Sequence, residues 1–180
     1  MDPTKPSISQ RRSASNNLNK TITLAEVSGL SIYADTGQGG PYRQTVLNLT
    51  NVSLAITDDG PAGHFSQKLF DFPDGAIVIS GALVDLTLTA TAGGNNTISL
   101  GSAATADATL SGTEVDICAA SSASSTVAEV CKTAVTYLDG TGTKKSCYLN
   151  GNTASDPSSG ATVTLNGRIV ITWMNQGDYE

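Results

Sequence analysis

FDFPDGAIVISGALVDLTLTAT, residues 70–91, contains the longest apolar strand that the sequence predicts. The run AIVIS is almost continuously apolar, and from Val84 onward apolar and polar residues alternate with period two. A strand covered on both faces at its start and on one face later suits a central position in a β-sandwich. Gly81 has no side chain to pack and predicts a bend within this strand.

The turn FDFPDG precedes this strand. It could be a binding loop, a metal site or an architectural corner of the fold. Phe70 and Phe72 share one parity and point to one face, with Asp71 opposite. Pro73 cannot continue a hydrogen-bonded ladder, and the step to Gly75 can turn the chain. We interpret Phe70, Phe72, Pro73 and Gly75 as a structural corner whose two rings plug one end of the core.

The segment TVTLNGRIVITW, residues 162–173, shows the cleanest alternation in the chain. Its inward row comprises Val163, Leu165, Ile169, Ile171 and Trp173. This row predicts a second antiparallel core strand, in which Trp173 closes the core. Gly167 falls in the same row and is expected to leave space for a large neighbouring side chain.

The alternation changes phase within RQTVLNLTNVSLAIT, residues 43–57. Leu47 and Leu49 lie in one phase, whereas the apolar residues from Val52 onward lie in the other. The slip falls between Thr50 and Asn51. Because a slip of one residue exchanges the two faces of a strand, this segment needs a β-bulge or a change of sheet.

Shorter strands complete the expected fold. They are predicted at residues 21–27, 30–34, 98–103, 114–120 and 146–151, whereas residues 126–138 fit two helical turns or a strand. Glycine-rich and serine-rich turns separate them, and 180 residues suffice for one domain with a core. The sequence therefore predicts an all-β protein, a jelly-roll-like antiparallel β-sandwich over residues 21–180 with an extended N-terminal arm.

The N-terminal arm, residues 1–20, is basic, whereas the rest of the chain is acidic. Lys5, Arg11, Arg12 and Lys20 against Asp2 give the arm a charge of +3; the whole chain carries −6, so the remainder carries −9. Such an arm predicts contact with an anionic partner surface, and the alternative is a solvated, disordered tail. Nucleic acid is an unlikely partner because the body lacks a basic patch with interleaved aromatics.

Targeting and cysteine patterns point to a protein that starts inside a cell. The opening residues lack the apolar core of a signal peptide, and no run predicts a membrane span. Cys118, Cys131 and Cys147 are odd in number and lack C-x-x-C spacing, so we expect buried, reduced thiols.

No motif predicts an enzyme, a metal site or a cofactor site. His64 is the only histidine and no G-x-S-x-G elbow accompanies it. Asp58, Asp59, Asp71 and Asp74 lack the spacing of a calcium loop, and turn aspartates that bond their own backbone explain them. A hydrolase would require a pocket around His64 with a nearby carboxylate.

Two stretches together resemble small β-sandwich virion proteins of tailed bacteriophages. They are FDFPDGAIVISGALVDLTLTA, residues 70–90, and ITWMNQGDY, residues 171–179, with YLNG, residues 148–151, between them. The resemblance covers residues 70–90 and roughly 135–179. It implies a capsid decoration (cement) protein on the virion head surface, assembled in the bacterial host cytoplasm, which binds the major capsid protein and forms a homotrimer. It supplies no functional residues.

The alternative is a carbohydrate- or receptor-binding β-sandwich of a head fibre or tail. Exposed Thr and Asn faces suit sugars, but Trp173 is the only tryptophan and falls on the inward row. Under the decoration hypothesis, Lys5, Arg11, Arg12 and Lys20 are the candidates for capsid contact.

Overall fold

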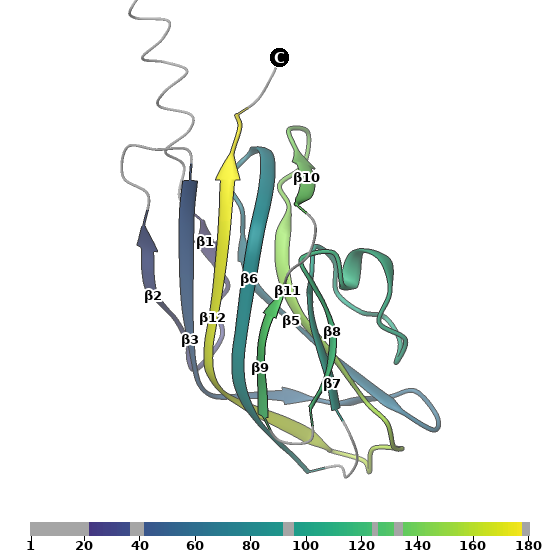
Figure 1. The fold of residues 1–180 in the computed structure, drawn as a ribbon. Helices are drawn as coiled ribbons and strands as arrows, with labels where there is room; N and C mark the ends of the chain where they lie inside the picture. The colour runs from purple at the N-terminus through teal and green to yellow at the C-terminus, as the bar shows by residue number, and fades with distance from the viewer. Residues whose placement is uncertain (1–21, 37–41, 92–95, 124–125, 132–134, 178–180) are drawn as a thin grey trace, which may run out of the picture.

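The chain folds into two antiparallel sheets that pack face to face (Figure 1). The computed structural model describes residues 22–36, 42–91, 96–123, 126–131 and 135–177. The only helix among them is the short 3-10 turn η1, Gly112–Glu114. The prediction of an all-β antiparallel sandwich is confirmed.

The first sheet, called sheet A, contains six strands. Their order is β1 (Thr23–Leu24), β5 (Gly63–Asp71), β11 (Ser146–Thr153), β7 (Asn96–Gly101) and β8 (Cys118–Ala123), and β4 (Thr57–Asp58) also pairs with β5. All six of these strands have nine residues or fewer, and three of them, β7, β8 and β11, lie in the turn-rich sequence between β6 (Gly75–Ala90) and β12 (Thr162–Asn175).

The second sheet, called sheet B, contains the three longest strands. Its order is β10 (Thr136–Gly140), β6 (Gly75–Ala90), β12 (Thr162–Asn175), β3 (Tyr42–Ala55) and β2 (Leu30–Thr36), and β9 (Thr126–Cys131) also pairs with β6. Figure 1 shows β3, β12 and β6 side by side. The two segments with the clearest alternation thus lie next to each other at the centre of this sheet, and residues 126–131 form a strand.

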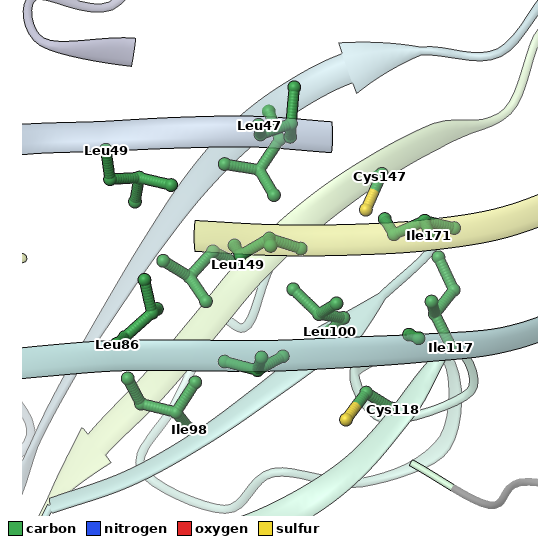
Figure 2. Packing of buried hydrophobic residues seen from close by; sticks show 14 of the residues in the cluster. Leu47, Leu49, Leu86, Ile98, Leu100, Ile117, Cys118, Cys147, Leu149 and Ile171 are labelled. Atoms are coloured by element: carbon green, nitrogen blue, oxygen red, sulfur yellow. The ribbon is translucent and has the colours of Figure 1, made fainter. Parts of the chain in front are cut away.

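Apolar side chains of both sheets meet in one core. Figure 2 shows Leu47, Leu86 and Ile171 of sheet B packing with Leu100 and Leu149 of sheet A. The predicted inward row of β12 is confirmed, since all of its members are 0% exposed: Val163, Leu165, Ile169, Ile171 and Trp173. Burial of this much apolar surface is the main stabilising contribution to the fold.

A bulge reconciles the phase slip of β3 with a continuous sheet. Leu49 pairs with Gly167 and Val52 with Leu165, so two residues of β3 lie opposite one residue of β12. Asn51 adopts φ 52, and its backbone N–H donates to Oδ1 of Asn166 at 2.8 Å. The slip at Thr50 is therefore a β-bulge, as one of the two predicted alternatives required.

The predicted role of Gly167 is wrong. A Cβ atom at this position would lie 2.2 Å from the backbone oxygen of Asp85, and the φ of Gly167 is +135. Gly167 therefore lets two backbones approach at the bulge, and it does not make room for a side chain. The register shift near it turns the residue out of the inward row.

Strand β5 was not predicted. Phe65, Leu69 and Phe70 are all buried, but Leu69 and Phe70 are adjacent in sequence. The pairing of β5 with β11 shifts register there, so both side chains enter the core. Period two is interrupted at this point, and polar residues fill the remainder of the strand.

Candidate functional site

The FDFPDG corner carries the chain from β5 of sheet A to β6 of sheet B. Phe70, Phe72, Pro73 and Gly75 are all buried. The rings of Phe70 and Phe72 have centroids 4.8 Å apart at an interplanar angle of 71°, and Phe72 meets Trp173 edge-on at 5.4 Å. These edge-to-face contacts close one end of the core.

Asn175 holds the corner in place. It is fully buried, its Nδ2 donates to the backbone oxygen of Asp74 at 3.0 Å, and its Oδ1 accepts from the N–H of Gly177 at 2.7 Å. Gly75 adopts φ +123, and a Cβ there would lie 2.5 Å from Oδ1 of Asn175. The glycine of FDFPDG is thus required by conformation and by space, and its surroundings are architectural.

The acidic residues of the corner make local contacts. Asp71 Oδ1 accepts from Nζ of Lys68 at 2.6 Å and from Oγ of Ser146 at 2.5 Å. Partial burial raises the pKa of Asp71, but the hydrogen bonds from Lys68 and Ser146 and the lysine charge outweigh it, so the pKa lies below its usual value. Outside the corner, Asp58 accepts from the N–H of Gly60, as predicted for a turn aspartate. The same prediction is wrong for Asp59, which accepts from the N–H of Ala108, 49 residues away.

Within the described ranges, no three His, Cys, Asp or Glu side chains come together as a candidate metal site. His64 lies on β5 opposite Asn152 of β11 and Thr57 of β4. Its Nδ1 is buried and has no hydrogen-bond partner. No described helix has the length and apolar character needed to span a membrane.

The expectation of three reduced thiols is wrong for Cys118, which forms a disulfide bond. Cys118 begins β8 and is 3% exposed. Cys147 is free and fully buried, and burial together with the charge of Asp116 raises the pKa of its thiol. Cysteine spacing along the chain could not reveal the disulfide, because the approach of two thiols is decided by strand packing.

The outer face of sheet A is polar and is covered by the chain itself. We call residues 102–117 the strap. Asn150 of β11 is 0% exposed; its Oδ1 accepts from Oγ of Ser66 at 2.6 Å and from the N–H of Thr105 at 3.1 Å. Its Nδ2 donates to the backbone oxygens of Ala103 and Glu114 at 2.9 and 3.0 Å. The strap thus supplies three of the four hydrogen bonds of this buried amide, and Ser66 of β5 supplies the fourth.

Other bonds fasten the strap along its length. Asn152 Nδ2 donates to the oxygen of Ala108 at 2.6 Å, and Ser99 Oγ donates to the oxygen of Glu114 at 2.8 Å. Gly101 allows the strap to lie directly on β7, since a Cβ there would lie 2.3 Å from the oxygen of Thr113. This polar network is structural.

The outer face of sheet B is different. Tyr42, Met174, Val78 and Tyr137 lie in register across β3, β12, β6 and β10. Tyr42 is 64% exposed and Tyr137 is 59% exposed. Val46, Val170 and Leu83 form a second apolar row, and the uncharged row Gln44, Thr172 and Gly81 lies between the two.

We call this surface the tyrosine face. Val46 is only 8% exposed and does not contribute to it. The face comprises Tyr42, Gln44, Val78, Gly81, Leu83, Tyr137, Val170, Thr172 and Met174. None of these side chains is charged, although the chain carries a net charge of −6. No described segment of the chain pairs with or hydrogen-bonds over this face. An exposed apolar surface with aromatic residues is typical of a protein contact site.

Sequence reasoning missed this surface. The alternation of β3, β6 and β12 marks their outward rows, but the many Thr and Asn residues of the chain favour polar outward rows. The exposed tyrosines stand at strand ends far apart in the sequence, so only strand order brings Tyr42 and Tyr137 onto one face. The predicted contact residues Lys5, Arg11, Arg12 and Lys20 lie outside the described residues.

No protein-family model matches the chain, and no curated protein matches it either.

Proposed function

We propose that the chain is a non-enzymatic structural protein of a tailed-phage particle, a decoration (cement) protein that binds the major capsid protein on the head. The single observation that carries the protein-contact role is the tyrosine face. Tyr42 and Tyr137 expose most of their surface on an otherwise compact body. Tyrosine is favoured at protein interfaces because it offers a large, rigid contact area at low entropic cost.

The resemblance to phage virion proteins supports the identity of the partner. The resembling stretches form the corner, β6 and the end of β12, which are the parts that build the sandwich. These stretches account for the fold, but they do not identify the surface that contacts the shell. For that contact the proposal keeps the basic arm, whose charge of +3 complements an acidic shell surface.

Binding to particles tests this function. Phage heads that lack the chain are incubated with the purified protein, and occupancy is measured by cryo-electron microscopy. We expect density for the sandwich at regular sites on the head, and loss of that density when Lys5, Arg11, Arg12 and Lys20 are all replaced by Gln. Lys144→Gln is a control that removes an exposed cation of the body. Wild-type protein that leaves the heads bare would refute the proposal.

A glycan-binding role is the second candidate, and Tyr33, Tyr42 and Tyr137 favour it. All three are well exposed, and aromatic rings can stack against sugars. A glycan array probed with the full chain separates the two functions. Saturable binding of one glycan that is lost in Tyr137→Ala would support the receptor-binding alternative, whereas a decoration protein is expected to bind none.

A further inference from the structure

The two outer faces of the sandwich differ in whether a segment of the chain covers them. The strap covers the polar face of sheet A and supplies three of the four hydrogen bonds of the buried Asn150. The tyrosine face of sheet B is apolar, and no described segment does the same for it. Apolar surface that the chain leaves open gains stability when another surface covers it.

We propose that the tyrosine face pairs with the tyrosine face of a second copy, across a two-fold axis that runs parallel to the strands between β6 and β12. The inference deepens the proposed function and rests on it for the idea that this face is a contact surface. A two-fold interface uses the same surface on both subunits, so the surface must be complementary to itself.

The register of sheet B has this self-complementarity. β10, β6, β12 and β3 are consecutive neighbours, so an axis between β6 and β12 exchanges β6 with β12 and β10 with β3. Tyr42 then faces Tyr137 of the second copy, and Met174 faces Val78 of the second copy. In the second apolar row, Val170 faces Leu83 of the second copy. Aromatic meets aromatic, and aliphatic meets aliphatic.

The uncharged row between them is complementary in shape. Gly81 of β6 pairs with Thr172 of β12, and the axis places Thr172 opposite Gly81 of the second copy. Apart from Gly81 itself and its two chain neighbours, no residue has an atom within 4 Å of the position where a Cβ of Gly81 would be. The glycine therefore leaves a depression that a threonine side chain of the second copy can enter.

Charge complementarity favours a second copy as the partner, and it favours an axis parallel to the strands over one perpendicular to them. Arg168 and Asp85 are directly paired on β12 and β6 in the row beyond the tyrosine face. The two-fold axis places Arg168 opposite Asp85 of the second copy, and the reverse. An axis perpendicular to the strands would instead bring Arg168 against the apolar rows. Two chains of −6 each can thus associate without uncompensated charge at the contact.

The footprint sets the strength of the pair. The footprint covers four strand positions and four rows, with β9 in place of β10 beside Leu83 and Asp85, and spans about 15 Å by about 20 Å between backbone positions. This area of about 300 Å² per subunit is below the standard size of a specific interface, so we expect a weak dimer that dissociates on dilution. A two-fold pair differs from the homotrimer that the resemblance implies.

Sedimentation equilibrium of the full chain over a range of concentrations tests the pairing. We expect wild-type protein to change from monomer to dimer as concentration rises. Asp85→Arg and Arg168→Asp each place like charges across the axis and should weaken the dimer about tenfold or more. Glu26→Arg makes the same change of charge as Asp85→Arg at an exposed loop away from the face, and it should dimerise like the wild type.

Mixing the two charge variants provides the decisive measurement. Each variant alone is expected to dimerise weakly, but in a mixed pair both crossing contacts join an Arg to an Asp, so the mixture should dimerise more strongly than either variant. Contacts within a single chain cannot restore dimerisation, because each variant chain carries two like charges at positions 85 and 168. Wild-type protein that stays monomeric up to about 1 mM, or single variants that dimerise like the wild type, or a mixture that dimerises no more strongly than either variant, would each overturn the pairing.

The outcome is separable from that of the proposed function. Dimers in solution with no binding to phage heads would retain the pairing and refute the decoration role. Occupied heads with a protein that is monomeric in solution would support the decoration role and refute the pairing.

Discussion

Nε1 of Trp173 donates a hydrogen bond to Oγ1 of Thr45 at 2.9 Å, and both residues are 0% exposed. Arg43 lies over the same indole, with Cζ 5.6 Å from the ring centroid, and Phe72 meets its edge. The closing tryptophan is therefore held by polar and aromatic contacts together. The bond to Thr45 satisfies the one polar group of the buried indole.

Replacing Trp173 by Phe is expected to lower the free energy of unfolding by about 2 kcal/mol, because a buried hydrogen bond and part of the ring volume are lost. Urea denaturation of Trp173→Phe, Thr45→Val and the double variant measures the coupling. We expect a coupling of about 1 kcal/mol between the two sites. Strictly additive losses would contradict an energetic role for this bond.

Asn150→Ala is expected to lower the free energy of unfolding by about 3 kcal/mol, because the amide makes four hydrogen bonds in a buried site. Hydrogen exchange at the amide of Thr105 should accelerate, since its acceptor is removed. Asn152→Ala is the matched control, as it loses a single bond to the strap and should cost about 1 kcal/mol. Equal effects of the two variants would show that Asn150 does not organise the strap.

Gly167→Ala and Gly60→Ala both introduce a side chain at a positive φ. Gly60 has open space around it, whereas a Cβ on Gly167 would meet the oxygen of Asp85. We expect Gly60→Ala to cost about 1 kcal/mol and Gly167→Ala to cost at least about 3 kcal/mol, as judged by thermal unfolding. Similar melting temperatures for the two variants would contradict the close approach of β6 and β12 at the bulge.

The stability difference between the wild type and Asp71→Asn should depend on pH. The pKa of Asp71 is lowered in the folded state from its ordinary value of 3.8, so the ionised carboxylate stabilises the fold above that value. The contribution disappears as pH falls through the folded pKa. We expect a difference of about 1 kcal/mol at neutral pH, a figure already reduced because Lys68 is partly exposed to solvent, and little difference once the pH is well below the folded pKa.

Lys68→Met provides the control for this titration. It removes the cation but keeps most of the apolar stem, so the effect of Asp71→Asn should be smaller in that background. A difference that grows toward acidic pH would have the opposite sign to the one expected.

Thiol titration checks the state of the cysteines. The chain has three cysteines, Cys147 is free, and Cys118 is in a disulfide. We expect one thiol per chain in denaturant without reductant and three after reduction. The single thiol should be unreactive in the native protein, because burial raises its pKa and blocks access. Cys147→Ser should abolish the signal that precedes reduction.

The period-two rows in the sequence were enough to predict the sandwich, the inward row of β12 and the slip in β3. Alternation is a local signal, because successive side chains of a strand point to opposite faces wherever the strand lies. The signal fails where pairing is irregular. Leu69 and Phe70 enter the core together at a register shift, and Gly167 leaves its row at a bulge.

By itself, therefore, the sequence determined which side chains of each long strand are buried and that the chain forms paired sheets. The tertiary structure alone decided that Cys118 forms a disulfide, that the strap covers Asn150, and that Tyr42 and Tyr137 share one face. The physical reason is that strand order and side-chain contacts across the sandwich depend on long-range packing, which a local pattern of two residues does not encode.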